Sequence, residues 1–202
     1  MKQPTQKRSR ARYEKILAAT SQLMSGRRLE DLTIREIAGA ADVPVGTIYQ
    51  FFGDKDGLFE ALAERFKTEV AAFSDNELTV DRARTDLGAF IDRLVDGIEA
   101  IQTENEGFIC LARTDSDAGR AGALADELRG KLRTHLDAVF AKAYPTVPPA
   151  KRKLFLEILN TTMISALART PPKGAKQRAP YIDEIKSMLT AYSQRTLAAR
   201  AG

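Results

Sequence analysis

Hydrogen-bonding side chains stand in a short uncharged segment at 45–52, and Thr47 and Gln50 carry much of its chemistry. A Gln amide pairs a donor with an acceptor, so it matches the edge of an adenine in the DNA major groove. Eight residues in helical form span about 12 Å, which is comparable with the width of that groove. On such a helix Ile48 and Phe52 fall on one face and the polar groups on the other. We therefore interpret 45–52 as a helix that docks against base pairs.

A second helix must hold this segment, and the pattern predicts it at 34–41. Thr33 and Glu36 form a Thr-x-x-Glu capping box at its start, and apolar residues follow at helical spacing. Asp42 tolerates a left-handed turn. Pro44 disfavours helix at the residue before it and fits the first position of a new helix. The whole pattern is that of a helix-turn-helix.

Two flanking helices complete a four-helix headpiece. Gly53 ends the short helix, and Asp54 caps a helix predicted at 55–73. The apolar stripe of that helix comprises Leu58, Phe59, Leu62, Phe66, Val70 and Phe73. An amphipathic helix that ends at Gly26 precedes the motif, and its inward residues are Tyr13, Ile16, Leu17, Thr20, Leu23 and Met24.

The motif residues occur in a fixed order: Ile37-Ala38, Val43, Gly46-Thr47-Ile48-Tyr49, Phe52 and Lys55. With this set, residues 10–66 resemble the tetracycline-repressor (TetR) family of transcriptional regulators. The resemblance implies an all-α protein of about nine helices, with a helix-turn-helix DNA-binding domain at 1–74. It also implies a helical domain at 75–202 that binds a small-molecule effector and dimerises. The implied partners are a double-stranded DNA operator, a second copy of the chain and an unidentified effector.

Ten residues are candidates for contact with DNA. They are Arg8, Arg10, Arg12, Thr33, Val45, Gly46, Thr47, Tyr49, Gln50 and Lys55. The three arginines belong to a tail, residues 1–28, that holds eight Lys or Arg against one acid, Glu14. Such a cationic tail supplies salt-sensitive affinity for the phosphate backbone, whatever the base sequence.

The remaining candidates divide between backbone and bases. By resemblance, the phosphate contacts are Thr33, Thr47, Tyr49 and Lys55. Gln50 is the residue best equipped to pair with an adenine, while Val45 and Thr47 can touch a thymine methyl group. Gly46 has two interpretations: it allows the helix to approach the DNA closely, or it serves helix packing.

Three positions depart from the family pattern. Asp42 stands where relatives commonly have Gly, so we expect a strained left-handed residue in the turn. Pro44-Val45 replaces a polar or basic pair, which removes a typical contact with DNA. Phe51 stands where a His or Tyr often contacts phosphate, and we interpret it as a packing residue.

Length and composition agree with this plan. A chain of 202 residues with 44% hydrophobic content can form a proper core. No apolar run approaches the eighteen or so residues of a membrane span. The basic N-terminus lacks the apolar segment of a secretory signal, and the one cysteine, Cys110, cannot form an internal disulfide. We expect a cytoplasmic protein that does not enter a membrane.

Charge is unevenly distributed in the second half of the chain. Residues 71–119 hold four basic and eleven acidic side chains, whereas residues 120–202 hold fifteen and six. The C-terminal excess of positive charge indicates a solvated surface or a second nucleic-acid site. We favour the solvated surface, because this excess does not lie beside a groove-reading motif.

The remainder is predicted to form five helices, at 81–103, 105–114, 122–143, 149–169 and 180–199. A linker at 170–179, rich in Pro, Gly and Lys, separates the last two. Their apolar stripes predict a four-helix dimer interface, formed by Leu156, Leu159, Met163, Leu167, Ile182, Ile185, Met188, Leu189 and Tyr192. The alternative is that these stripes serve the core of the single chain.

An effector pocket is expected, by resemblance, between helices of the second domain. Its candidate lining residues are Phe90, Leu94, Phe108, Leu111, Arg113, His135 and Met163. Pockets of this kind are mainly apolar with a few polar groups, here Arg113 and His135. A single inward His is more often a satisfied core residue, and Cys110 is more often a small core hydrophobe than a redox sensor.

Two functions remain from different classes. The first is a homodimeric repressor that leaves a near-palindromic operator when a small molecule binds. The second is a DNA-binding factor without an effector, with an architectural or partner-recruiting role. An enzyme is less well supported, because the sequence has no metal-ligand spacing, nucleophile motif or phosphate-binding glycine loop. We therefore expect no catalytic residue, metal or cofactor.

Overall fold

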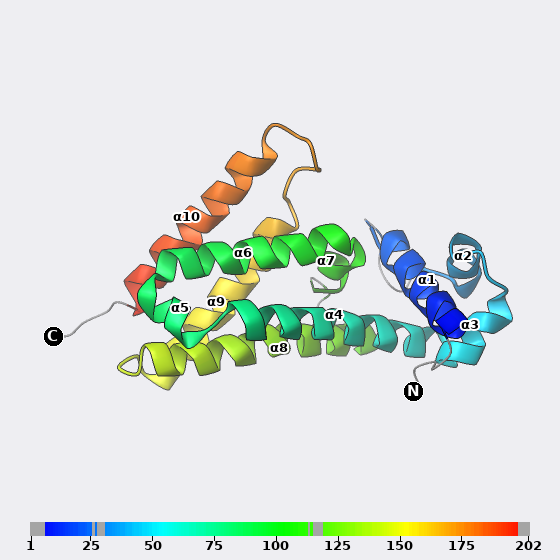
Figure 1. The fold of residues 1–202 in the computed structure, drawn as a ribbon, viewed down its shortest axis with the longest axis horizontal. Coiled ribbons are helices and arrows are strands. Elements are labelled where there is room, and N and C mark those ends of the chain that lie inside the picture. The colour runs from blue at the N-terminus through cyan, green and yellow to red at the C-terminus, as the bar shows by residue number, and fades with distance from the viewer. Residues whose placement is uncertain (1–6, 26, 28–30, 113, 115–118, 198–202) are drawn as a thin grey trace. The chain divides into compact units, whose positions relative to one another are not determined.

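Ten helices account for the secondary structure in the part of the chain that the computed structural model describes, residues 7–25, 27, 31–112, 114 and 119–197. They are α1 (Lys7–Leu23), α2 (Ile34–Ala40), α3 (Val45–Phe52), α4 (Lys55–Glu77), α5 (Val80–Thr85), α6 (Leu87–Glu104), α7 (Gly107–Ala112), α8 (Gly119–Ala143), α9 (Pro149–Leu167) and α10 (Arg178–Leu197) (Figure 1). The expected all-α class is confirmed. Within these ranges, no helix combines the length and hydropathy that crossing a membrane requires.

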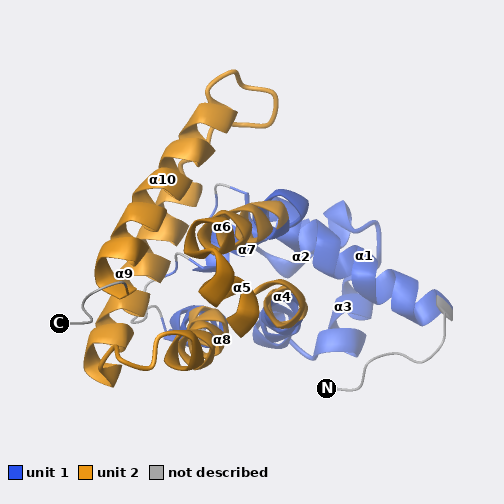
Figure 2. Ribbon diagram, turned by 60° about the vertical axis from the view of Figure 1, so that its left-hand side comes forward, with its two compact units in different colours: residues 1–68, 101–128 blue, residues 69–100, 129–202 orange. Residues whose placement is uncertain are grey.

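The helices divide into two compact units (Figure 2). The first unit comprises Met1–Thr68 with Ile101–Leu128, and the second comprises Glu69–Ala100 with Arg129–Gly202. Three helices, α4, α6 and α8, therefore contribute residues to both units. Residues 101–128 belong to the first unit, whereas a domain boundary at 74 would assign them to the second domain. The boundary at 74 stays a prediction.

The core of the first unit is formed by one face of each of its helices. Its fully buried side chains include Ile16, Leu17, Met24, Leu32, Ile37, Ile48, Leu58, Phe66 and Phe108. The rings of Phe66 on α4 and Phe108 on α7 meet edge to face, with centroids 5.6 Å apart. The four helices of the headpiece thus share their core with α7, a helix from the middle of the chain.

The core of the second unit contains a row of aromatic rings. Phe140 on α8 lies 5.3 Å from Phe90 on α6 and 5.7 Å from Phe155 on α9, and Phe155 lies 5.4 Å from Tyr192 on α10. Helices α9 and α10 pack against each other. The Tyr181 hydroxyl strengthens that pair by donating to the Ala166 carbonyl at 3.3 Å.

The predicted helix at 81–103 is wrong in its continuity, because Asp86 interrupts it. Asp86 has extended backbone angles, φ −153° and ψ 101°. Its carboxylate accepts a hydrogen bond from the Ala89 amide at 3.0 Å, so it caps α6. Thr79 caps α5 in the same way, through the Arg82 amide at 3.4 Å. The caps at Thr79 and Asp86 divide this segment into two helices, although its apolar periodicity continues through both.

The largest of the other differences from the expected helix boundaries lie in α8 and α4. Helix α8 begins at Gly119, three residues before the predicted start at 122. Helix α4 continues to Glu77, beyond the predicted end at 73. Neither Pro nor Gly follows the predicted end of α4 at residue 73, so the sequence gives this helix no stop signal there.

Candidate nucleic-acid interface

The start of α2 carries the predicted capping box. The Glu36 amide donates to the Thr33 hydroxyl oxygen at 3.2 Å, and the Thr33 amide donates to Glu36 Oε2 at 2.8 Å. The Thr33 hydroxyl also donates to Glu36 Oε2, at 2.7 Å. Hydrogen bonds from Thr33 and then from Arg27 lower the pKa of Glu36 from 4.5 to about 2. The donor of Thr33 is therefore already engaged with a carboxylate, so a phosphate contact through this hydroxyl must replace that bond.

The turn between α2 and α3 contains the expected left-handed residue. Asp42 has φ 47°, a left-handed conformation that is uncommon outside Gly but that Asn and Asp tolerate better than other residues. The Val43 amide donates to the Ala38 carbonyl at 3.0 Å, which closes the turn. The Lys15 ammonium of α1 lies 3.3 Å from the Asp42 carboxylate. Asp42 thus links the turn to α1, at the cost of a strained backbone.

Helix α3 has the predicted bounds and the predicted faces. Ile48 is fully buried, and Phe52 is 4% exposed. The opposite face is open, with Val45 39% and Tyr49 50% exposed although both are large apolar or aromatic side chains. The outward residues of the helix are Val45, Gly46, Tyr49 and Gln50, while Thr47 is half-buried. An exposed surface of this kind, uncharged but able to donate and accept hydrogen bonds, suits base edges.

Aromatic packing fixes the end of α3 against α1. Tyr13 stacks on Phe52 with centroids 4.9 Å apart and meets Phe51 edge to face at 6.0 Å. Burial, with a further contribution from Glu14, raises the pKa of Tyr13, so its phenol stays protonated at neutral pH. Phe51 is half-buried in this cluster, in agreement with its interpretation as a packing residue.

Gly46 lies on the open face of α3. A Cβ built at this position would meet no heavy atom of the described residues within 4 Å. Packing within the protein therefore does not require a glycine here. This disfavours the helix-packing interpretation, and close approach to DNA stays a prediction.

The first unit also contains the cationic residues that are candidates for contact with phosphates. Arg8, Arg10 and Arg12 are exposed on α1. Lys55, at the start of α4, is half-buried, and its ammonium lies 5.6 Å from the centroid of the Phe59 ring. The side chains expected to neutralise phosphates and those expected to read bases thus belong to the same unit.

The candidate effector residues do not all belong to one unit. Phe90, Leu94 and Met163 are buried in the second unit, and His135 is half-buried there. Phe108 and Leu111 are buried in the first unit. Arg113 lies outside the described residues.

His135 is tied to the backbone of the second unit. Its Nε2 lies 2.8 Å from the Leu78 carbonyl oxygen, and its Nδ1 lies 3.3 Å from an Asp75 carboxylate oxygen. The Leu78 carbonyl can only accept, so Nε2 donates this hydrogen bond and joins α8 to the residue that follows α4. This placement matches a satisfied core residue better than a polar group directed at a ligand.

Ser74 is a buried polar group that the sequence analysis missed. It is 1% exposed on α4, and its hydroxyl has no hydrogen-bond partner within the described part of the chain. A buried hydroxyl without a partner costs about 1 to 3 kcal/mol. The signal was present, since Ser74 interrupts the apolar series Phe66, Val70 and Leu78 at steps of four residues.

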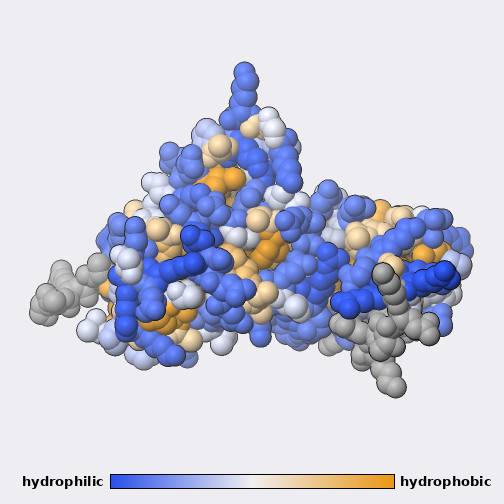
Figure 3. Space-filling view, in the orientation of Figure 1, coloured by the Kyte–Doolittle hydropathy of each residue, from blue (hydrophilic) through white to orange (hydrophobic). Residues whose placement is uncertain are grey.

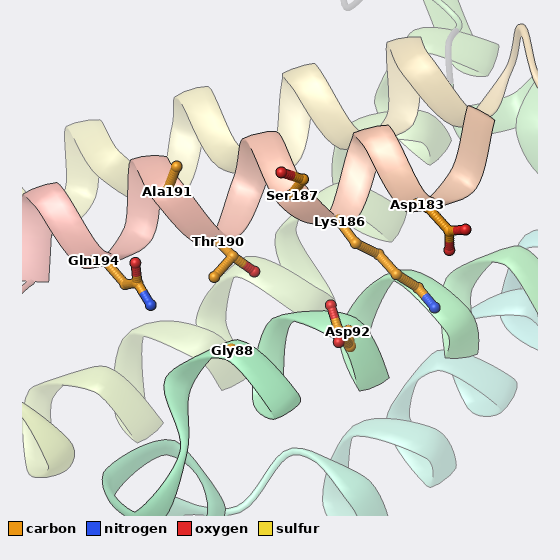
Figure 4. A pocket seen from close by; sticks show the side chains of 8 residues that line it. All are labelled: Gly88, Asp92, Asp183, Lys186, Ser187, Thr190, Ala191 and Gln194. Atoms are coloured by element: carbon orange, nitrogen blue, oxygen red, sulfur yellow. The ribbon is translucent and has the colours of Figure 1, made fainter. Parts of the chain in front are cut away.

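Two hollows lie on the surface of the second unit. A groove of about 510 Å³ runs between α6 and α10 (Figure 4) and is lined by Gly88, Asp92, Asp183, Lys186, Ser187, Thr190, Ala191 and Gln194. A smaller hollow of about 340 Å³ between α8 and α9 is lined by Arg133, Thr134, Asp137, Lys153, Leu156 and Glu157. Most of the residues that line both hollows are polar or charged, whereas mainly apolar residues are expected around an effector.

The stripes predicted as a dimer interface are largely buried in the single chain. Leu156, Leu159, Met163, Leu167, Ile185 and Leu189 are at most 3% exposed. Ile182 and Tyr192 are half-buried, and Met188 is 47% exposed. The six buried residues contribute to the core of the single chain, which favours the alternative for them, and the dimer interface stays a prediction.

Other apolar side chains of α9 and α10 do face outward. Leu154 is 58% exposed and Ile158 is 42% exposed, one helical turn apart on α9. They join Met188 of α10 as the exposed large apolar residues described in this unit. Figure 3 shows hydrophobic surface over α10 among hydrophilic residues. The sequence also indicated this exposed pair, because Leu154 and Ile158 are four residues apart and offset from the main stripe.

Models of known protein families match both halves of the chain. A model of bacterial regulatory proteins of the tetR family matches residues 16–62, and a model of the tetracycline repressor-like C-terminal domain matches residues 86–192. An uncharacterised HTH-type transcriptional regulator of Bacillus subtilis, YvdT, is 30% identical over 105 residues, which is 52% of this chain and 53% of that protein. Another, from Haemophilus influenzae, is 42% identical over 52 residues, 26% of this chain and 28% of its own length. The chain thus spans about half or less of these curated relatives.

Solved structures share the fold. A tetR-family regulator from Streptomyces coelicolor has a TM-score of 0.69 at 21% identity, covering 94% of this chain and 83% of that chain. Salmonella enterica GusR has a TM-score of 0.69 at 17% identity, covering 94% and 97%. At these identities the likeness concerns the fold.

Proposed function

This chain belongs to the TetR family of transcriptional regulators and carries the family's helix-turn-helix DNA-binding domain, and we propose that it acts in the cytoplasm as a ligand-responsive repressor. In this proposal a homodimer binds a near-palindromic operator and leaves it when a small molecule binds. The observation that carries the proposal is the open face of α3, where Val45, Tyr49 and Gln50 are exposed while Ile48 anchors the helix from behind.

The proposed roles follow from side-chain chemistry. Arg8, Arg10, Arg12 and Lys55 neutralise phosphates, and the hydroxyl groups of Thr47 and Tyr49 donate hydrogen bonds to them. Gln50 reads an adenine, and Val45 contacts a thymine methyl group. Gly46 lets the helix approach the bases, since its environment makes no other demand for a glycine. Specificity then rests on few side chains, because the outward face of α3 has no charged residue.

Dimerisation is proposed through the outward face of α9 and α10. The support is the exposure of Leu154, Ile158 and Met188, since a monomer rarely leaves several large apolar side chains of one helix pair in water without a partner. Two-fold symmetry would present two copies of α3, which fits an operator made of two inverted half-sites.

The effector is proposed to bind in the core of the second unit. Phe90, Leu94 and Met163 offer apolar walls there, and Ser74 offers a hydroxyl that has no hydrogen-bond partner among the described residues. An effector with a hydrogen-bonding group among apolar atoms would satisfy that hydroxyl. Release of DNA requires the effector to bind two states of the protein unequally.

A compound panel tests the proposal. We expect at least one compound to raise the melting temperature of the purified protein and to weaken its binding to a selected DNA duplex at the same concentrations. If compounds that stabilise the protein leave DNA binding unchanged, the ligand-responsive role is excluded. DNA binding with no response to any compound favours the architectural alternative.

Two serine variants locate the effector site. Ser74→Ala removes an unpaired hydroxyl, so we expect equal or higher stability together with roughly tenfold weaker effector binding. Ser193→Ala is the matched control. Ser193 is equally buried, but its hydroxyl donates to the Leu189 carbonyl at 2.7 Å. We expect this control to lose stability and to keep its response; the reverse pattern would place the effector elsewhere.

A further inference from the structure

Helix α7 is attached to the end of α1 by polar contacts and close packing. The Gly107 amide donates to the Ser21 hydroxyl at 3.0 Å, and this hydrogen bond is buried. A Cβ at Gly107 would stand 3.0 Å from Ser21 Cα and 3.0 Å from the Ser21 carbonyl oxygen, both backbone atoms. The Cys110 thiol of α7 donates to the Arg27 carbonyl at 2.9 Å. The absence of a side chain at Gly107 thus lets α7 lie directly on the chain that leads to α2.

Arg27 continues this attachment to the helix-turn-helix. One guanidinium nitrogen donates to Glu36 Oε1 at 3.0 Å, and the other donates to the Asp31 carbonyl at 3.0 Å. The other oxygen of the Glu36 carboxylate holds the amide and hydroxyl of Thr33, the N-cap of α2. A single residue therefore contacts α7 through its backbone and the cap of α2 through its side chain.

The side chain of Arg27 differs in its contacts from the arginines that are proposed to bind DNA. Its side chain is 39% exposed, and both of its terminal nitrogens are directed at acceptors of the protein. Arg8, Arg10 and Arg12 by contrast are exposed along α1. The carboxylate that Arg27 holds is ionised throughout the physiological range, because its pKa is about 2. The contact is therefore present whenever the protein is folded at neutral pH.

We propose that Arg27 is a positioning residue for DNA binding: it fastens the start of α2 to α7 and so sets the orientation in which α3 meets the groove. A base-reading helix gains specificity only when its side chains reach the base edges in register, whereas phosphate contacts tolerate small rotations. Arg27 therefore governs specific binding more than non-specific binding. The inference depends on DNA binding through α3 and not on an effector.

The competing interpretation is that Arg27 contacts a phosphate directly. The two interpretations differ in three measurable respects. A phosphate contact contributes to all sequences alike and adds about one to the salt slope of binding. It also acts independently of Glu36. A positioning contact acts through Glu36. Its loss leaves the salt slope unchanged and lowers affinity mainly for the selected sequence.

The test uses the full-length protein and two duplexes, one selected from a random library by the wild-type protein and one with the same bases in scrambled order. The variants are Arg27→Gln, Glu36→Gln and the double variant. Lys131→Gln is the matched control for the loss of one positive charge, because Lys131 is exposed on α8 in the second unit. Circular dichroism melts establish the temperature range in which each variant is folded.

We expect Arg27→Gln and Glu36→Gln each to lower affinity for the selected duplex by roughly tenfold, the size of one lost charge-assisted hydrogen bond. The double variant is expected to match the singles within about twofold, because both break the same contact. Affinity for the scrambled duplex and the salt slope should stay close to those of Lys131→Gln. Arg27→Lys, which keeps the charge but has one nitrogen for two acceptors, should fall between wild type and Arg27→Gln.

A second measurement reports on the attachment without DNA. Amide hydrogen exchange at Thr33 and Glu36 should become faster in Arg27→Gln, and also in Gly107→Ala, where the added methyl group must displace α7 from Ser21. The proposal is overturned if Arg27→Gln weakens both duplexes equally and lowers the salt slope by about one, or if the losses of Arg27→Gln and Glu36→Gln add in the double variant. Unchanged exchange in both Arg27→Gln and Gly107→Ala overturns it as well.

Discussion

Helices α3 and α9 both present apolar residues at helical spacing, yet they use them in opposite ways. In α3 the apolar face is short, Ile48 and Phe52, and the chemistry lies on the outward side. In α9 the apolar face is long and wholly buried. Leu154 and Ile158 of the same helix are exposed, and no described residue covers them. Periodicity thus identifies which face of a helix is buried, but not whether the same chain or a second copy buries it.

The largest expected effect distinguishes the two apolar series of α9. Leu159→Ala removes a fully buried side chain and should lower the free energy of unfolding by about 2 to 5 kcal/mol. Ile158→Ser, at the neighbouring exposed position, should leave the fold intact and weaken the dimer. Urea unfolding measures the first effect, and sedimentation over a concentration series measures the second. A weakened dimer with unchanged stability in Leu159→Ala would return the buried stripe to the interface.

Two glycines of the first unit provide the next contrast. A Cβ at Gly57 would stand 2.1 Å from the Phe52 carbonyl oxygen, so Gly57→Ala must move α3 relative to α4 and should cost about 1 to 3 kcal/mol. Gly46→Ala meets no neighbour and should raise helix stability by about 0.5 to 1 kcal/mol. Thermal melts and DNA titrations should therefore disagree for Gly46→Ala, which is expected to be more stable but to bind DNA less tightly. Unimpaired DNA binding would show that the helix does not approach the bases at Gly46.

Gln50 and Lys55 separate base reading from phosphate contact. Gln50→Ala should cost roughly 1 to 3 kcal/mol on the selected duplex and relax the preference at one base pair. Lys55→Ala should weaken all duplexes alike and reduce the salt slope by about one. Titrations over a salt series with selected and scrambled duplexes measure both effects. Equal losses on the two duplexes for Gln50→Ala would remove it from base recognition.

The smallest expected effect concerns the cap of α2. The folded-state pKa of Glu36, about 2, lies below its ordinary value of 4.5, so its ionised form stabilises the fold above pH 4.5. That contribution is lost as the pH falls from 4.5 towards 2. The difference in melting temperature between wild type and Glu36→Gln should therefore be constant near neutral pH and shrink over this acidic range. Added salt should reduce it too, because the group is exposed. A difference that persists at pH near 2 would contradict this assignment.

Local signals explain how much of the fold was predictable. The bounds of α3 and the capping box at Thr33 depend on residues a few positions apart, and both were predicted correctly. The break at Asp86 was also encoded locally, in an aspartate that accepts from the amide three residues later, but the apolar periodicity across it concealed the cap. Fold class and motif therefore followed from neighbouring residues.

Contacts between distant residues explain what could not be predicted. Arg27 binds a residue nine positions away and receives the thiol of a residue 83 positions away. No spacing in the sequence records such pairs, so Arg27 was counted with the cationic tail. The unpaired hydroxyl of Ser74 likewise emerges when the neighbours of the residue are known, although its place in an apolar series was visible beforehand.

The central claim is that α3 reads base pairs and that a dimer presents it twice. Selection of duplexes from a random library by the full-length protein, followed by measurement of the mass of the complex with the enriched duplex, tests it most directly. We predict an inverted repeat bound by protomers in multiples of two, with enrichment lost in Gln50→Ala at one position of each half-site. Enrichment of no sequence, or a complex with a single protomer, would contradict the claim.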